Sequence, residues 1–522
     1  MGYYLNPSNK GFLRSLRSEI YVDKSGIISY TNKVLDTNQK YVCVSRPRRF
    51  GKTITAEMLA AYYSRSCDSY NMFQNLKIAN DPGFNDHLNK YNVIFVNMQM
   101  FLSGSHNIDK MIVDIFESIV EDILKVQPGL YQYTSKGRCA DAMQALYEAS
   151  DTPIVFIIDE WDCIFREFTT DKASQRIYLD FLRNLLKDRD YVALAYMTGI
   201  LPIKKYGTHS ALNMFDEFSM TDPGPLAEYV GFTCNEVQEL CDRYKTDYEE
   251  MAEWYDGYRF PDTENVYNPK SAVSALLFKR FSNYWSRTET YEALGIYIKM
   301  NFDGLKDVIV KLLAGEENDL DITSFTNDMV TFESYEDVLT LLVHLGYLGY
   351  CLETHKVFIP NREIANEFMT AVRAAGWNEI TAALKASDDL LKSTWLEDAE
   401  SVARAIEKAH NEISILKYND ENSLACVISL AYYNARQYYS IIREMPAGKG
   451  FADLVFLPKK NHMDKPAMII ELKWDKSAAG AIKQIESRQY PEAIKDYREN
   501  ALLIGINYNI DLKRHECVIK RL

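Results

Sequence analysis

Three residues near the carboxyl-terminal end of the chain have the types and spacing of a divalent-metal site. Glu471 and Lys473 lie two positions apart in the apolar run 467–474, so a β-strand would present both side chains on one face. Asp453 begins another apolar run earlier in the chain. On adjacent strands, Asp453, Glu471 and the Leu472 carbonyl oxygen could bind Mg²⁺ or Mn²⁺, because hard cations prefer oxygen ligands. Lys473 would then hold or deprotonate an attacking water, and this combination can cleave phosphodiesters.

The same residues have a simpler interpretation, in which Glu471 and Lys473 form an ion pair on an exposed strand and Asp453 caps a turn. The spacing alone favours that interpretation, since it is common on exposed strands. The apolar residues that flank both acids, and Gln484 in the next expected helix, favour the metal site instead. Glu421, before these strands, could add an outer acid. The sequence leaves open whether the site is catalytically active or belongs to a degenerate fold that only binds.

The stretch 46–53, Arg-Pro-Arg-Arg-Phe-Gly-Lys-Thr, has the pattern of a phosphate-binding loop. It lies between an expected strand and an expected helix, where the helix N-terminus attracts an anion. Gly51 would let the backbone approach the phosphates, Lys52 would reach the β- and γ-phosphates, and Thr53 would bind Mg²⁺. The usual pattern begins with Gly, and this chain has Arg46 there. The arginines of the loop could neutralise phosphate charge, reach a neighbouring molecule or form surface ion pairs. The residues expected to contact the nucleotide are Arg48, Arg49, Phe50, Gly51, Lys52 and Thr53.

A later strand supplies the acids that such a loop needs. The apolar run that starts at 153 ends in Asp159 and Glu160. Asp159 would hold Mg²⁺ through water or through Thr53, and Glu160 would polarise the water that attacks the γ-phosphate. Thr198 ends the next expected strand, where a polar sensor of the γ-phosphate is expected. In this order, at the carboxyl ends of sheet strands, these residues predict binding of ATP.

Around these residues, apolar runs with little alternation indicate a parallel α/β sheet. Strands are expected at 40–45, 92–97, 153–158 and 192–197, with helices at 52–66 and 108–126. The pattern becomes helical after residue 216, and 338–360 could form a winged-helix-like piece. From residue 385 we expect helices, then strands at 438–445, 451–457, 467–474 and 501–508, with a helix at 478–496 before the last strand. The expected domains are a lead-in at 1–35, an ATPase domain at 36–215, a helical domain at 216–384 and a last domain at 385–522.

Several motifs resemble those of the bacterial AAA-ATPase-like family. They are Tyr21–Lys24, Arg46–Thr53, Thr198–Ile203, Ser210–Asn213 and Trp254–Tyr258. The resemblance implies a P-loop ATPase of the AAA or STAND kind, in which the Arg-Pro-Arg-Arg-Phe form of the loop is normal. In such proteins the ATPase domain is typically joined to a carboxyl-terminal domain of the PD-(D/E)XK nuclease superfamily.

The order of elements expected after residue 385 is also that of the PD-(D/E)XK core. The resemblance assigns Asp453 and Glu471 as the two acids and Lys473 as the lysine. Gln484 and Tyr490 match the Gln…Tyr pair that related nucleases carry on the next helix. The whole chain is therefore expected to be α/β, with a P-loop NTPase domain, a helical middle domain and an αβββαβ domain like that of restriction endonucleases.

The bulk composition narrows the classes of function. A formal net charge of −14 argues against a protein that coats nucleic acid indiscriminately. The nine cysteines are scattered with no CxxC pair, which argues against a zinc site or a disulfide framework. This pattern is what we expect of a protein in a reducing cytoplasm. No signal peptide and no run long enough to span a membrane is found. The histidines lack the spacing of a zinc hydrolase, and no Gly-x-Ser-x-Gly elbow is present.

We therefore expect a cytoplasmic bacterial ATPase joined to a metal-dependent nuclease, with the ATP state controlling the nuclease. Its cofactors would be ATP and Mg²⁺, or Mn²⁺ at the nuclease site, and its partner nucleic acid, DNA in preference to RNA. No membrane partner is expected, and self-association into a homo-oligomer is left open. The alternative is a STAND-like switch, in which ATP drives assembly and the last domain binds a partner without cleaving it.

Overall fold

The computed structural model describes residues 2–131, 138–203, 212–261, 263–285, 291–300, 302–326, 329–330, 332–412 and 421–522. The chain divides into two compact units. Unit 1 consists of Met1–Thr290 and Asp319–Asn366, and unit 2 of Tyr291–Asn318 and Glu367–Leu522. The division into a lead-in and three domains stays a prediction.

A parallel sheet forms the centre of unit 1. Its strands lie in the order β2-β3-β4-β1-β5, and all neighbouring pairs are parallel. Every residue of β1, β3 and β4 is buried, as expected of apolar runs covered on both faces. The four strands predicted from the sequence are confirmed, and the short edge strand β5 was not predicted. The strands are β1 (Tyr41–Ser45), β2 (Asn92–Asn97), β3 (Ile154–Asp159), β4 (Val192–Gly199) and β5 (Asp216–Phe218).

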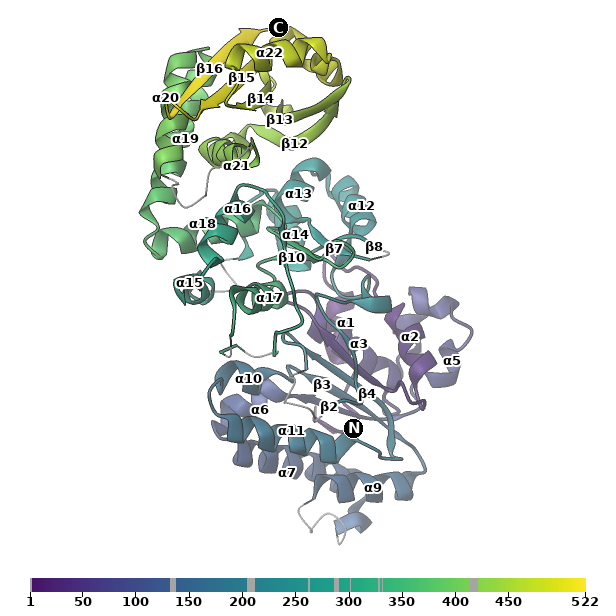
Figure 1. Cartoon of the computed structure of the whole chain (residues 1–522). Helices are drawn as coiled ribbons and strands as arrows, with labels where there is room; N and C mark the ends of the chain where they lie inside the picture. Colours follow the sequence, from purple (N-terminus) through teal and green to yellow (C-terminus); the bar gives the residue numbers. More distant parts are fainter. Residues whose placement is uncertain are drawn as a thin grey trace. The chain divides into compact units, whose positions relative to one another are not determined.

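Helices cover both faces of this sheet. Figure 1 shows α6, α7, α9 and α11 on one side of β2–β4, with α1 and α3 on the other, and α3 contacts all three strands. The predicted helix at 108–126 is confirmed as α7, whose N-cap Asn107 accepts a hydrogen bond from the Lys110 N–H. The helices are α1 (Lys10–Leu16), α2 (Ile27–Val34), α3 (Lys52–Tyr63), α4 (Tyr70–Phe73), α5 (Phe84–His87), α6 (Met98–Ser105), α7 (Ile108–Val126), α9 (Cys139–Ser150), α10 (Cys163–Glu167) and α11 (Lys172–Leu186).

The rest of unit 1 combines helices with short strands. The predicted helix and hairpin at 338–360 are present as α17, β10 and β11. In the motif Trp254–Tyr258, Gly257 has φ +113°, and a Cβ there would lie 2.1 Å from the Pro360 carbonyl oxygen. The Tyr258 hydroxyl donates to the Gly346 carbonyl at 2.7 Å, so this motif packs the unit together. The elements are β6 (Phe232–Thr233), α12 (Cys234–Tyr244), α13 (Tyr248–Tyr255), β7 (Tyr258–Phe260), β8 (Thr263–Tyr267), α14 (Pro269–Phe278), α17 (Tyr335–Leu345), β10 (Gly349–Cys351) and β11 (Lys356–Phe358), with β9 (Asn318–Asp319) at the boundary of the units.

Unit 2 is built on a second five-stranded sheet. Its strands lie in the order β12-β13-β14-β15-β16; β14 and β15 are parallel, and the other pairs are antiparallel. Helix α22 packs on β14 and β15, and Gly505 allows this contact because a Cβ there would lie 2.3 Å from the Ala478 carbonyl oxygen. The elements are α21 (Glu421–Ala431), β12 (Tyr439–Ala447), β13 (Gly450–Pro458), β14 (Ala467–Trp474), α22 (Ala478–Ser487), β15 (Ala501–Asn509) and β16 (Arg514–Arg521). The predicted αβββαβ order is confirmed, with β16 added.

The prediction of a single helix at 478–496 is wrong. Helix α22 ends at Ser487, Gln489 adopts a left-handed conformation with φ +58°, and residues 490–500 form a 3₁₀ segment. Pro491 explains the break, because proline lacks an N–H and clashes with the preceding helical turn. Tyr490 therefore lies after α22 and not on the same helix as Gln484.

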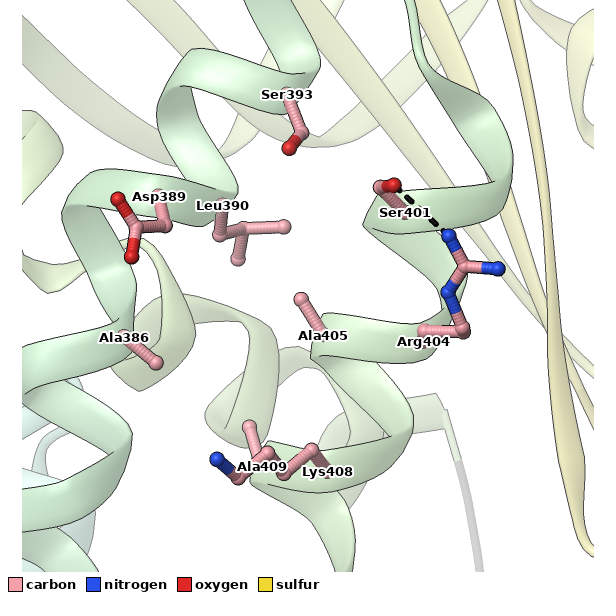
Figure 2. A pocket seen from close by; sticks show the side chains of 9 residues that line it. All are labelled: Ala386, Asp389, Leu390, Ser393, Ser401, Arg404, Ala405, Lys408 and Ala409. Carbon is pink, nitrogen blue, oxygen red and sulfur yellow. Dashed lines mark hydrogen bonds between the residues drawn. The ribbon is translucent and has the colours of Figure 1, made fainter.

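The remaining helices of unit 2 include a packed pair, α19 and α20. These two helices leave a cavity of about 230 Å³ between them, in which Arg404 donates to the Ser401 hydroxyl at 3.0 Å (Figure 2). The cavity contains none of the residues predicted to bind ATP or metal. Within the described ranges, no helix is long and apolar enough to cross a membrane. The helices are α15 (Tyr291–Met300), α16 (Leu305–Leu313), α18 (Arg362–Ala374), which begins in unit 1, α19 (Asn378–Trp395) and α20 (Ala399–Glu412).

Candidate nucleotide and metal sites

The loop between β1 and α3 turns on two residues with positive φ. Arg49 has φ +69°, and Gly51, the N-cap of α3, has φ +96°. The first backbone N–H groups of α3 therefore begin at a glycine, where an anion can approach closely. Arg48 and Arg49 are exposed beside this turn. The local geometry is that of an anion-binding loop.

Arg46, which stands where the usual pattern has Gly, is completely buried. Its Nη1 donates to the carbonyl oxygens of Ser45, Phe218 and Ser219 at 2.9, 2.9 and 3.1 Å. Its guanidinium also lies 5.1 Å from the centre of the Phe260 ring. Burial lowers the pKa of Arg46 to about 10. Arg46 therefore joins the ends of β1 and β5, which is a structural role.

Lys52 lies at the start of α3 with 4% of its surface exposed. Its Nζ donates to the Pro47 carbonyl oxygen at 3.0 Å, so the side chain folds back along the loop. Burial lowers the pKa of Lys52, although the nearby Glu160, Asp162 and Asp159 oppose that shift. A buried ammonium group with one backbone acceptor can turn to an anionic ligand at this position.

Asp159 lies at the end of β3, directly beside the start of α3. Its Oδ2 accepts hydrogen bonds from the Thr53 hydroxyl at 2.8 Å and from Asn97 Nδ2 at 3.0 Å. Burial, and then the charge of Glu160, raise the pKa of Asp159 to about 6. The structure thus brings together Thr53 and Asp159, the two residues predicted to hold Mg²⁺ in this unit.

Glu160 has a left-handed backbone, with φ +53°, and an ion pair with Arg166 at 2.5 Å. Arg166 also contacts Asp162 at 3.3 Å. Asp162 accepts hydrogen bonds from the backbone N–H groups of residues 200 and 201 at 3.0 and 2.9 Å. The carboxylate predicted to polarise water is therefore held by a cation of the same chain.

Two other predicted contacts of the nucleotide have buried side chains. The Thr198 hydroxyl, at the end of β4, donates to the Val44 carbonyl at 3.0 Å. The Phe50 ring packs edge-to-face on Tyr258, with ring centres 5.3 Å apart. In this conformation Phe50 can offer a ligand its backbone, and Thr198 joins β4 to β1.

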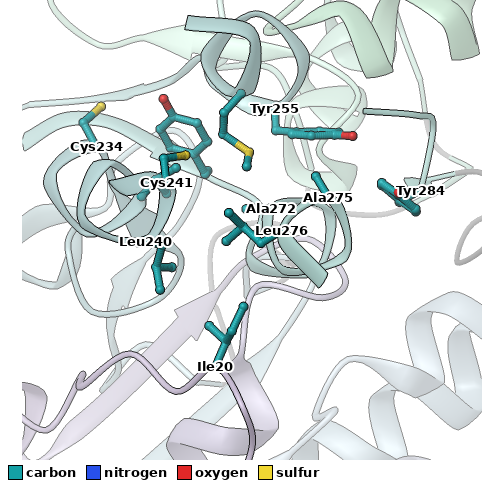
Figure 3. Close-up of a cluster of buried hydrophobic side chains, with 12 residues drawn as sticks. Ile20, Cys234, Leu240, Cys241, Tyr255, Ala272, Ala275, Leu276 and Tyr284 are labelled. Atoms are coloured by element: carbon teal, nitrogen blue, oxygen red, sulfur yellow. The ribbon is translucent and has the colours of Figure 1, made fainter. Parts of the chain in front are cut away.

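A cavity of about 720 Å³ lies beside the loop. This volume is within the ordinary range of small-molecule sites. The loop and Glu160 line it together with apolar side chains of the lead-in and of α14, among them Ile20, Val22, Val273 and Leu277. Ile20 also belongs to the apolar core formed by α12–α14 (Figure 3). The cavity therefore combines the polar loop predicted to bind phosphate with an apolar side that could accept a nucleobase.

In unit 2, the three residues predicted to form the metal site lie together. Asp453 Oδ2 accepts a hydrogen bond from the Leu472 N–H at 2.7 Å. Lys473 Nζ donates to Glu471 Oε1 at 2.9 Å and to the Leu472 carbonyl at 2.8 Å. Glu471 is 1% exposed and Lys473 9% exposed. The simpler interpretation, a pair on an exposed strand, is wrong because β14 is covered by α22.

Gln484 of α22 completes this cluster. Its Nε2 donates to Glu471 Oε1 and, at 3.4 Å, contacts the Tyr490 hydroxyl. Arg488 Nη1 lies 3.4 Å from the same hydroxyl. Glu421 begins α21, and its side chain lies outside the described residues.

The residues of this cluster fit a divalent cation. Glu471 Oε2 is buried and, among the described residues, has no hydrogen-bond partner. Burial, and then the charge of Asp453, raise the pKa of Glu471 to about 7. A bound cation would satisfy that oxygen and offset the repulsion between the two acids. No group of three or more His, Cys, Asp and Glu side chains suited to a metal occurs in the described part of the chain, so further ligands would be backbone oxygen or water.

Sequence reasoning did not single out Asn97, Arg166 or Arg488. Asn97 ends β2 next to Asp159, and its polar side chain at the carboxyl end of a buried strand was a usable signal. Arg166 lies in the short helix α10 and Arg488 directly follows α22, and neither carries a local pattern. Both contacts are local: Glu160 lies six residues before Arg166, and Tyr490 lies two residues after Arg488.

Two family models match the chain. The model described as predicted AAA-ATPase covers residues 13–208, and that of the PD-(D/E)XK nuclease superfamily covers residues 419–518. The chain therefore carries an AAA-ATPase-like domain followed by a PD-(D/E)XK nuclease-superfamily domain. These matches, with the two sheets, confirm the predicted resemblance and the α/β fold class.

One curated relative and two solved structures share only low sequence identity with this chain. A protein of Azotobacter chroococcum mcd 1, described as an uncharacterized protein in the vnfD 5′ region, is 25% identical over 277 residues. That match covers 52% of this chain and 51% of the relative, so the chain spans about half the length of the curated relative it matches. Cdc6p from Pyrobaculum aerophilum is 14% identical, with a TM-score of 0.27, over 70% of this chain and 98% of that one. The Aeropyrum pernix ORC2 protein is 13% identical, with a TM-score of 0.31 and the same coverage. At these TM-scores the two structures do not define a shared fold.

Proposed function

We propose that this protein binds and hydrolyses ATP in unit 1 and cleaves nucleic acid in unit 2 with Mg²⁺ or Mn²⁺. The observation that carries the nuclease is a buried oxygen of Glu471, beside Asp453 and Lys473, that has no hydrogen-bond partner in the described part of the chain. A carboxylate oxygen in that position is costly unless a cation or proton satisfies it. The match to the nuclease superfamily supports the same conclusion.

In the proposed reaction, Asp453, Glu471 and the Leu472 carbonyl oxygen hold the cation. When bound, the cation would stabilise the negative charge that grows on the phosphate. Lys473, once it leaves Glu471, would hold the attacking water by donating a hydrogen bond from its ammonium group, and the proton of that water would pass to a second water molecule. Gln484 orients the Glu471 carboxylate through its amide, as their hydrogen bond indicates. The proposed substrate is nucleic acid, DNA in preference to RNA.

For ATP, the loop, Lys52 and Thr53 would hold the phosphates and Mg²⁺, with Asp159 positioned by Thr53 and Asn97. Glu160 would orient the attacking water once it leaves Arg166. Arg48 and Arg49 are exposed cations that can meet the phosphates. A cytoplasmic location and a bacterial source remain predictions; the nine free cysteines are consistent with the former.

The test compares the purified wild-type protein with its Asp453→Asn and Glu160→Gln variants. Single- and double-stranded DNA and RNA are incubated with Mg²⁺ or Mn²⁺, with and without ATP. We expect cleavage that needs metal and Asp453, and ATP turnover that needs Glu160 but not Asp453. ATP binding with no cleavage of any substrate would contradict the nuclease and favour the STAND-like switch.

A further inference from the structure

The tip of the β12–β13 hairpin in unit 2 carries an exposed aromatic ring next to the metal site. Phe451 is 62% exposed and lies two residues before Asp453 on β13. Lys449, at the turn, and Arg488, after α22, are also exposed. Resting on the proposed nuclease function, we propose that Phe451, Lys449 and Arg488 form a subsite that binds an unpaired nucleotide of the substrate strand.

The hairpin tip is held against the segment that follows α22. The Lys449 N–H donates to the Arg488 carbonyl at 2.8 Å. Gly448 has φ +52°, and a Cβ there would lie 2.0 Å from that same oxygen. Only a glycine allows this approach, because a side chain would push the tip away. The backbone positions that carry Lys449, Arg488 and Phe451 are therefore fixed relative to one another.

The same segment connects the tip to the metal site. A Cβ on Gly450 would lie 2.8 Å from Arg488 Nη1 and 3.0 Å from the Tyr490 hydroxyl. That hydroxyl contacts Gln484, which donates to Glu471. Along a strand, residues two apart are separated by roughly 7 Å, so Phe451 is within about one nucleotide of Asp453.

The chemistry of the tip suits a nucleic acid strand. An exposed phenylalanine offers no hydrogen bond, and a nucleobase can stack on it whatever its sequence. Asp453 and Glu471 repel phosphate in the absence of metal, and the charge of the whole chain is −14. Lys449 and Arg488 supply positive charge where the strand must pass these acids. A duplex would hide its base faces, so the subsite fits a single-stranded or locally opened substrate.

The experiment measures binding of full-length protein to labelled single-stranded DNA and RNA by fluorescence anisotropy. The Asp453→Asn background prevents cleavage during the measurement. Phe451→Ala should weaken binding about 5- to 150-fold, the range of one lost stacking contact. Phe451→Trp should keep the affinity, and Leu512→Ala, at a residue that is 66% exposed elsewhere in unit 2, should not change it. Lys449→Ala should lower the slope of log affinity against log salt by about 1.

A second measurement reports stacking directly. A 2-aminopurine base near the 5′ or 3′ end of the strand should lose fluorescence on binding when Phe451 is present and not when it is Ala. If wild-type protein binds and cleaves nucleic acid but Phe451→Ala behaves identically, the subsite is overturned and the nuclease stands. If no nucleic acid binds to either protein, both proposals fail. If Phe451→Ala changes only self-association in light scattering, the ring serves a protein contact and the subsite is likewise overturned.

Discussion

Replacement of Lys52 by Ala tests the proposed ATP site most directly. The side chain is 4% exposed, and its ammonium donates to the Pro47 carbonyl at 3.0 Å, close enough to the loop to reach a bound phosphate. A hydrogen bond to a charged group contributes about 1.5–3 kcal/mol. Its loss corresponds to roughly 10- to 150-fold weaker binding at 1.4 kcal/mol per tenfold. Lys52 also lowers the pKa of Asp159, so its loss should raise that pKa.

Thermal or denaturant unfolding with and without ATP and Mg²⁺ measures this loss. At a ligand concentration of about 100 Kd, the wild-type protein gains about 2.7 kcal/mol, whereas a variant with 100-fold weaker binding gains about 0.4 kcal/mol. Lys33→Ala, at an exposed lysine of α2, is the matched control and should keep the full gain. A folded Lys52→Ala protein with the same ATP-induced stabilisation and turnover as wild type would refute the assigned role of Lys52.

Two further predictions concern stability. Gly448→Ala places a Cβ 2.0 Å from the Arg488 carbonyl oxygen at φ +52°. It should therefore cost about 1–3 kcal/mol and lower the Tm, whereas Gly104→Ala, whose Cβ would meet no atom within 4 Å, should leave the Tm unchanged or slightly higher. An equal Tm for the two variants would contradict this assignment. Burial lowers the pKa of His410 to about 4 and that of His515 to about 3. As the pH falls, these histidines therefore bind protons in the unfolded state before they do so in the folded state. Stability should be complete above about pH 6.5 and decline as the pH falls toward those values. Denaturant unfolding should show a loss of about 1.4 kcal/mol per histidine, about 2.7 kcal/mol for the pair, between about pH 7.5 and 5.5. His515→Phe should roughly halve that loss, and an unchanged slope in that variant would contradict the assignment to the histidine pair.

Local patterns were sufficient to predict the elements that carry both sites. Short-range rules predict three elements: the strand and loop around Gly51 and Lys52, the acids at the end of β3, and the strand with Glu471 and Lys473. Each rule depends only on residues close together in the chain: a glycine at the start of a helix, an apolar run that ends in acids, and side chains that alternate between the two faces of a strand. The nature of these elements was therefore predictable, and the roles assigned to the residues stay predictions.

The helix predicted through 496 shows where short-range rules fail. The apolar spacing after residue 478 favours one long helix, but Pro491 and the left-handed Gln489 end it early. A proline in this position was visible in the sequence and should have outweighed the periodicity, since its effect on the backbone is steric and local. The short strand β5 and the edge strand β16 lack such signals and form because they pair with β1 and β15.

The amino-acid sequence by itself determined which residues are candidates for phosphate binding and metal binding, because those residue types and spacings are set within a few positions of the chain. Only the tertiary structure decided the surroundings of those residues. Burial of Arg46 between β1 and β5 and the contact of Gly448 with Arg488 join segments far apart in sequence. Burial and the nearby charges depend on long-range packing. These two factors shift pKa values and leave one Glu471 oxygen without a hydrogen-bond partner among the residues that the structure describes.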